Sequence, residues 1–329
     1  MNRKMLTRRL FISTSLASLA PPALLADAAP LSVVTTTGMI ADTVRRIGGN
    51  TVSVRGLMGA GVDPHSYRQT RNDIVAMTRA DLVLWNGLYL EAQMEPFLQK
   101  LARRQPVYAV TDRIEASARA GAGGALMANP DYTDAFDPHI WMDPGQWQHV
   151  ADRVAEILIG LRPGSKTTVT ENLTTFVSEL DQLTAYGKRA MAQIPHERRV
   201  LITAHDAFSY FGQAFGLDVM GVQGISTESE AGLHRIRELV DLLVERNMEA
   251  IFVESSVSDR NMRALIEGAE ARGHEVRLGG QLFSDAMGPA GTYEGTYVGM
   301  IDHNITTIAR ALGADVPQGG LFDRLSAGS

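Results

Sequence analysis

The sequence predicts an α/β protein of two similar lobes, each a parallel sheet flanked by helices, joined by one long backbone helix. Three observations predict this fold. Short β-branched or apolar runs alternate with amphipathic segments, as in parallel sheets covered by helices on both faces. The order of these segments in the first half of the chain returns in the second half. Between the halves lies one long segment with a single apolar stripe at helical spacing.

The chain of 329 residues is long enough for two such lobes. We predict an N-terminal lobe over residues 29–165, a linking helix over 166–194 and a C-terminal lobe over 195–329, all preceded by a signal peptide at 1–28.

The first lobe opens with a β-branched run at 33–37, which Gly38 ends, and an amphipathic segment follows it. The later elements are expected in this order: a strand at 51–59, a helix at 70–80, strands at 81–87 and 105–112, and a helix at 145–164. Residues 116–136 are rich in Ala and Gly and show no period, so we expect a surface loop there.

The linking helix is predicted from five apolar residues separated by four, three, four and three positions: Val169, Leu173, Phe176, Leu180 and Leu183. Its length corresponds to about 40 Å at 1.5 Å per residue. In the second lobe, a strand, turn and helix at 198–217 repeat the pattern of 31–49, and the later segments follow the order of the first lobe. Two such lobes leave a cleft between them, and the functional loops of parallel sheets lie at the carboxyl ends of the strands.

The first 28 residues have a basic start, a moderately apolar stretch and a cleavage-like Ala26-Asp27-Ala28. The pair Arg8-Arg9 favours a twin-arginine export signal, and an ordinary secretion signal is the alternative. We therefore expect an exported, periplasmic protein.

Composition excludes several classes of protein. The formal net charge of −6 argues against nucleic acid as a partner, because binding to phosphates needs a basic face. The absence of cysteine excludes disulfides and a lipid anchor on an N-terminal cysteine. No later apolar run reaches the roughly 18–20 residues of a membrane span. We expect a free, monomeric protein without a lipid anchor.

Four residues stand where the loops should meet the cleft. The tripeptide Asp-Pro-His occurs twice and places His65 and His139 in stiff, non-helical turns. His205 directly follows a predicted strand, and so does Asp285. Three imidazoles and one carboxylate suit a divalent transition metal. Simpler roles remain open, since Asp285 can cap a helix and His205 can hydrogen-bond its own turn.

Two acidic residues near the cleft, Asp63 and Glu230, are further candidates for contact with the metal or with its ligands. The remaining histidines are expected to have surface or structural roles, with His303 buried: His149, His196, His234, His274 and His303.

The motifs "GVDPHSY", "DPHIWMDP", "ITAHDAFSYFGQAFGL" and "LFSDAMGPAGTYEGTYVGMIDHNITTIARALG" resemble those of the periplasmic metal-binding proteins of ABC importers, the zinc/manganese solute-binding family called cluster A-I. The resemblance covers roughly residues 30–315. It implies one divalent metal ion as the transported ligand, held between the lobes by His65, His139, His205 and Asp285. It also implies an ABC importer membrane permease as the partner.

The third motif bears on the choice of metal. Manganese-selective members often carry Glu where this chain has His205, whose setting "AHDAF" resembles the TroA-like proteins and the zinc binders. The zinc-specific branch often has a long loop rich in His and Asp near the cleft, and the segment 116–136 contains no histidine. Because imidazoles favour zinc over manganese, we favour zinc. A two-atom contact from Asp285 keeps manganese possible, and the alternative is a manganese- or iron-preferring binder of the same family.

More distant alternatives are a zinc-dependent hydrolase and an adhesin. A hydrolytic zinc site usually keeps an open position for water, whereas four protein ligands close the site. The chain contains no G-x-S-x-G, no H-E-x-x-H and no phosphate-cradling glycine loop, and no adhesive surface is apparent. We therefore predict that the protein is not an enzyme and has no catalytic residues.

Overall fold

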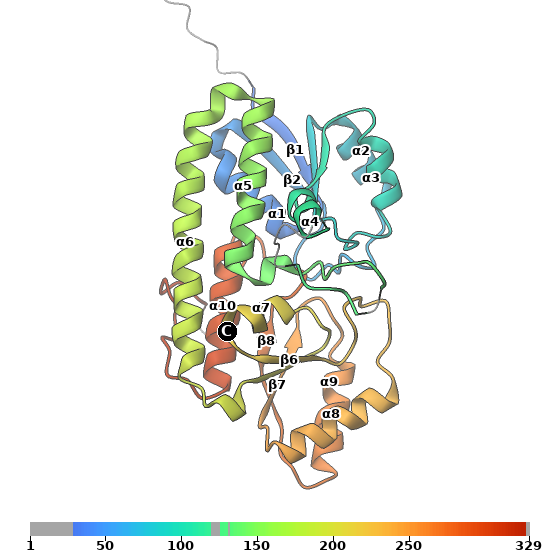
Figure 1. Ribbon diagram of the computed structural model, residues 1–329, viewed down its shortest axis with the longest axis vertical. Coiled ribbons are helices and arrows are strands. Elements are labelled where there is room, and N and C mark those ends of the chain that lie inside the picture. The colour runs from blue at the N-terminus through green and yellow to red at the C-terminus, as the bar shows by residue number, and fades with distance from the viewer. Residues whose placement is uncertain (1–28, 120–125, 131, 327–329) are drawn as a thin grey trace, which may run out of the picture.

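The computed structural model describes residues 29–119, 126–130 and 132–326. Two α/β lobes lie one above the other, and one long helix runs along the side of both (Figure 1). This arrangement confirms the predicted fold class. The signal peptide predicted at 1–28 lies outside the described residues, as does part of the loop predicted at 116–136.

The first lobe contains a fully parallel sheet with the strand order β2-β1-β3-β4. Its strands are β1 (Leu31–Thr35), β2 (Val52–Gly56), β3 (Leu82–Trp85) and β4 (Val107–Ala109). Its helices are α1 (Gly38–Gly48), α2 (Arg71–Arg79), α3 (Glu95–Leu101), α4 (Asp112–Arg119) and α5 (Pro144–Leu161). Neighbouring residues of β1 are buried on opposite faces, Val33 with the core that includes α1 and α5, and Val34 with the core under α2 and α3.

Helix α4 corrects the prediction of an uninterrupted loop at 116–136, because it extends to Arg119. The Nη2 atom of Arg119 donates to Oε1 of Glu115 at 2.7 Å, one helical turn away. Alanine is also the best helix former, so a segment rich in Ala can be helical even without an apolar stripe.

The linking helix α6 (Lys166–Ala192) is buried along the predicted stripe, with Leu173 as its one partly buried member. It packs against α1 and α5 of the first lobe and against α7 (Ser209–Phe215) and α10 (Tyr297–Ala311) of the second. The helix therefore forms a wall common to both lobes.

The second lobe contains two parallel pairs of strands where one sheet was expected. One pair is β5 (Val200–Thr203) with β6 (Asp218–Gly221), and the other is β7 (Ala250–Glu254) with β8 (Arg277–Leu282). Strand β5 lies beside β7, so the order of the strands in space still resembles that of the first lobe. The remaining helices are α8 (Leu233–Glu245) and α9 (Arg260–Glu270).

The two lobes share a packed interface as well as a helix. One hydrophobic cluster includes residues of both lobes. The ring of Trp147 stacks on that of Tyr297, with 5.3 Å between centroids and 12° between planes. The backbone N–H of Tyr297 also donates to Oδ2 of Asp42 at 2.9 Å. Within the described residues, no helix is both long and apolar enough to cross a membrane.

Candidate metal centre

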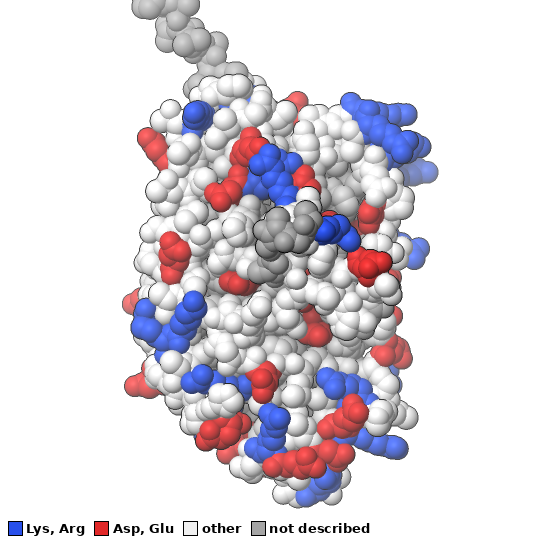
Figure 2. All heavy atoms as spheres, viewed as in Figure 1, with Lys and Arg blue, Asp and Glu red and all other residues white. Residues whose placement is uncertain are grey.

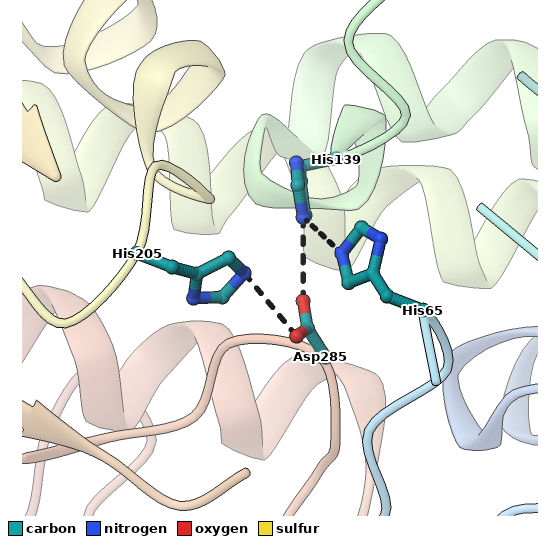
Figure 3. A group of neighbouring side chains, drawn as sticks. All are labelled: His65, His139, His205 and Asp285. Carbon is teal, nitrogen blue, oxygen red and sulfur yellow. Dashed lines mark hydrogen bonds and ion pairs between the residues drawn. The ribbon is translucent and has the colours of Figure 1, made fainter. Parts of the chain in front are cut away.

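The four residues singled out in the sequence come together between the lobes (Figure 3). One ligand atom from each of His65, His139, His205 and Asp285 lies within 4.8 Å of the others. The Nε2 atoms of His65 and His139 are 3.2 Å apart. The carboxylate of Asp285 faces two rings, with Oδ1 3.4 Å from Nε2 of His139 and Oδ2 3.2 Å from Nε2 of His205.

Each side chain comes from a loop beside the parallel strands. His65 follows β2, and His139 immediately precedes a 3-10 turn at Ile140–Met142 that leads into α5. His205 follows β5, and Asp285 follows β8. His205 lies in the turn between β5 and α7, which begins at Ser209. The shared location is the usual one for binding sites in parallel sheets.

The centre is closed to solvent, because the four side chains are between 0% and 4% exposed. Three of its polar atoms, Nε2 of His205 and both oxygens of Asp285, have no hydrogen-bond partner among the described residues. Buried polar atoms are normally satisfied, since desolvation without a partner is unfavourable. An ion bound at this point would provide the missing partner.

Two carboxylates outside the cluster orient two of the rings. Asp137 Oδ1 accepts a hydrogen bond from Nδ1–H of His139 at 2.7 Å, and Glu254 Oε2 accepts one from Nδ1–H of His205 at 2.6 Å. Each bond places the proton on Nδ1 and leaves the lone pair of Nε2 directed into the centre, as is common for histidines that bind metals. The sequence interpretation missed both roles. For Asp137 the repeated Asp-Pro-His motif was a signal. For Glu254 the one signal was that this residue ends a buried strand.

The repeated motif has a local explanation. In both copies the aspartate accepts a hydrogen bond from the backbone N–H of the histidine, Asp63 from His65 at 2.8 Å and Asp137 from His139 at 3.0 Å. This is the turn that aspartate favours two residues before its donor. The motif therefore fixes the backbone that presents each imidazole.

Asp63 also joins the turn of His65 to the second lobe. Its Oδ2 atom accepts a hydrogen bond at 2.7 Å from the hydroxyl of Thr227, which belongs to the second lobe. Between His65 and the neighbouring loop of the second lobe remains a gap of about 20 Å³, room for a single water. Asp63 thus supports a candidate ligand, as one of the sequence alternatives proposed, whereas Glu230 is exposed.

The other five histidines lie outside the cluster. His303 is buried as expected, with its Nε2 atom 2.8 Å from the carbonyl oxygen of Gln281. His274 is 2.6 Å from the carbonyl oxygen of Met248.

The three histidines of the centre differ in the direction in which their pKa values are shifted. Burial lowers the pKa of His65 to about 4. Burial also disfavours the charged forms of His139 and His205, but the neighbouring carboxylates outweigh it. Asp137 and Asp285 raise the pKa of His139 to about 9, and Asp285 and Glu254 raise the pKa of His205 well above its usual value. Burial raises the pKa of Asp285, yet the imidazoles of His205 and His139 bring it well below its usual value.

The spacing of the ligand atoms fits a small divalent ion. A tetrahedral ion with bonds of about 2.0–2.1 Å has ligand atoms about 3.3–3.4 Å apart along each edge. The separations of 3.2 Å between His65 and His139, 3.4 Å from His139 to Oδ1 of Asp285 and 3.2 Å from His205 to Oδ2 of Asp285 are each close to that value. Because the two oxygens of Asp285 face different histidines, the same set also permits five contacts.

Comparisons with known proteins agree with this geometry. Residues 33–311 match the family described as zinc-uptake complex component A periplasmic. The chain is 47% identical over 287 residues to the zinc-binding protein TroA of Treponema pallidum (strain Nichols). The aligned region covers 87% of this chain and 90% of the relative. It is 43% identical over 282 residues to the manganese-binding lipoprotein MntA of Bacillus subtilis (strain 168), and the alignment covers 86% of this chain and 90% of that relative.

A solved structure of the periplasmic zinc binding protein TroA from Treponema pallidum has the same fold, with a TM-score of 0.81 and 46% identity. The alignment covers 86% of this chain and 99% of that structure. Two lobes that enclose three imidazoles and a carboxylate define a solute-binding protein for a divalent metal ion. The chain belongs to the family of the periplasmic component A of zinc-uptake complexes, which confirms the resemblance seen in the sequence motifs.

Proposed function

We propose that this exported protein captures one divalent transition metal ion in the periplasm, zinc in preference, and delivers it to the membrane permease of an ABC importer. The ligands are His65, His139, His205 and Asp285. One observation carries the proposal: nitrogen and oxygen atoms without other protein partners converge on one buried point, and carboxylates behind two of the rings direct their lone pairs there.

Zinc is the first candidate because three of the four ligands are imidazoles, which suit zinc better than the harder manganese ion. The near-tetrahedral separations and the relative named as zinc-binding support the same choice. Manganese is the second candidate. The two oxygens of Asp285 face different histidines and so favour a higher coordination number, and another relative is named as manganese-binding.

The buried centre favours transport over catalysis. Four protein ligands enclose the ion and leave no open position for a reactive water. On the face shown in Figure 2, acidic and basic side chains are interspersed, with one basic cluster at the upper right. This mixed surface and the net charge of −6 do not suit nucleic acid.

Export is supported by the family and by the basic, apolar segment at 1–28, for which we propose the twin-arginine route. Several of the relatives, MntA among them, are named lipoproteins, whereas the present sequence contains no cysteine. We propose that the protein acts as a single chain, since each lobe supplies two of the four ligands.

The test is a titration of the purified, metal-stripped protein with zinc and with manganese. Calorimetry measures the affinities, and elemental analysis counts the ions bound per chain. We expect one ion per chain and a tighter zinc complex. His234→Ala is the matched control, because this histidine is 88% exposed and lies outside the centre. Two equivalent tight sites, no tight site, or a loss of binding in the control would contradict the proposal.

A further inference from the structure

Asp285 differs from the histidines beside it in how its side chain is held. His139 and His205 are each oriented by a carboxylate on the far side of the ring. Neither oxygen of Asp285 is held by a described residue outside the centre, and the neighbours of both oxygens are the Nε2 atoms of the candidate ligands themselves. The position of this carboxylate therefore depends on the backbone that carries it.

That backbone is fixed from its own lobe by an asparagine, and the hydroxyl of Ser284 in the same turn lies 3.0 Å from that of Ser256. The amide of Asn304, on α10, binds both polar atoms of the Phe283 backbone. Its Oδ1 atom accepts from the N–H at 3.0 Å, and its Nδ2 atom donates to the carbonyl at 2.7 Å. This pair of bonds holds the end of β8 against the helix but does not set its distance from the first lobe.

The same turn is fixed from the other lobe by a tryptophan. The indole N–H of Trp141 donates to the carbonyl of Ser284 at 2.8 Å, one residue before Asp285. Trp141 lies two residues after His139, and the two rings contact each other with 5.1 Å between centroids. The tryptophan is fully buried, and its own carbonyl accepts a hydrogen bond from the hydroxyl of Tyr297 at 2.8 Å. One side chain thus joins the turns that carry two ligands from different lobes.

We propose that Trp141 is a positioning residue that sets the spacing between His139 and Asp285 across the lobe boundary, and thereby the preference of the site between zinc and manganese. This inference rests on the proposed function. With the turn held from both lobes, each oxygen of Asp285 stays beside a different histidine. Manganese needs both oxygens, because it favours oxygen ligands and more than four contacts.

Removal of the indole N–H takes away the hydrogen bond that ties the turn to the first lobe. Zinc binds well with four contacts and can draw in one oxygen of Asp285, so its complex tolerates the change. For Trp141→Phe we expect the Kd of manganese to rise by about tenfold or more, as is typical when a residue behind a metal ligand is lost, and the Kd of zinc to rise by less than about threefold.

Trp147→Phe is the matched control. Trp147 is also fully buried and stacks on Tyr297 at the lobe interface, but its indole N–H donates to the hydroxyl of Thr43 at 3.0 Å and not to the Asp285 turn. Both variants lose a buried hydrogen bond and part of an aromatic ring, but only Trp141→Phe releases the Asp285 turn. The ratio of the two Kd values should therefore change in Trp141→Phe and stay at the wild-type value in Trp147→Phe.

If Trp141→Phe does not fold, replacement of the indole by its benzothiophene isostere keeps the shape of the ring and removes only the donor. Cobalt(II) then provides a second measurement, since its visible absorption strengthens when five contacts fall to four. We expect stronger absorption in the isostere than in wild type. An unchanged spectrum together with an unchanged Kd ratio, or an equal change of the ratio in the Trp147 control, would overturn the role of Trp141. Failure of wild type to bind metal would instead contradict the proposed function.

Discussion

The two lobes supply equal numbers of candidate ligands from differently built frames. The first presents His65 and His139 from loops beside a continuous four-stranded sheet, and the second presents His205 and Asp285 from loops after two separate pairs of strands. Each lobe nevertheless backs one histidine with a buried carboxylate. In the first lobe the carboxylate lies two residues before its histidine in the same turn, whereas in the second it comes from β7, 49 residues along the chain.

The three histidines of the centre also differ in their charge. In the metal-free protein the raised pKa values of His139 and His205 make these two rings cationic near neutral pH, beside the carboxylate of Asp285. Burial keeps His65 neutral, although Asp285 lies nearby, and its ring forms no ion pair with a carboxylate among the described residues. The ion pair between His139 and Asp285 therefore joins the lobes before metal arrives, whereas that between His205 and Asp285 lies within the second lobe. The metal must displace protons from one histidine of each lobe.

Removal of His139 should have the largest effect. We expect His139→Ala to raise the Kd of zinc by about a thousandfold or more, roughly 4 kcal/mol, because one of four bonds is lost and Asp285 loses a neighbour. Calorimetry measures the change. The variant also leaves Asp137 buried without its partner, which should destabilise the metal-free fold. The double variant with Asp137→Asn should recover stability but not affinity; recovery of both would show that His139 is structural.

The dependence on pH should be nearly as large. The pKa of His139, about 9, lies above the ordinary 6.5, so its protonated form stabilises the metal-free fold fully below about pH 6.5. This stabilisation is lost as the pH rises through about 9. Stabilisation by zinc should accordingly increase over the same interval, since fewer protons must be displaced.

Calorimetry in buffers of different ionisation enthalpy counts the protons released. We expect about two per zinc near pH 7.5, from His139 and His205, and an affinity that changes by up to about tenfold per proton for each pH unit. Release near zero, with an affinity that is flat from pH 6.5 to 9, would mean that the two rings are neutral in the metal-free protein.

The supporting carboxylates allow a direct comparison of the lobes. Glu254 uses both oxygens, one for the ring of His205 and one for its backbone N–H, whereas Asp137 uses Oδ1 for both contacts with His139. An amide keeps a single oxygen acceptor. We expect Glu254→Gln to weaken zinc binding by about 10- to 100-fold, and Asp137→Asn by less. Equal losses in titrations of the two variants would remove this distinction between the lobes.

The smallest effect concerns selectivity. His205→Glu replaces a nitrogen ligand with a carboxylate that suits manganese, so the preference for zinc over manganese should fall by about tenfold, roughly 1.4 kcal/mol. The new carboxylate also faces Glu254, and the double variant with Glu254→Gln is needed to remove that repulsion. Competition titrations measure the ratio in both variants. An unchanged ratio in the double variant would mean that His205 does not contact the ion.

Much of the fold and the proximity of the four side chains could be predicted from the sequence. Strands and helices alternate, and His205 and Asp285 follow apolar strands directly, so both had to reach the same edge. Contacts made only in space could not be predicted. The bond from Glu254 to His205 depends on β7 lying beside β5, and the bond from Trp141 depends on how the lobes meet. The sequence pattern of the strands likewise did not indicate that the second sheet is divided into two pairs.

The most direct test of the four-ligand centre is a crystal structure of the zinc-loaded protein with anomalous diffraction data at the zinc absorption edge. We expect one strong peak per chain between the lobes, about 2.0–2.2 Å from Nε2 of all three histidines and from a carboxylate oxygen of Asp285. A principal peak elsewhere on the chain, or a peak in the cleft that is not bonded to one of these four residues, would contradict the centre proposed here.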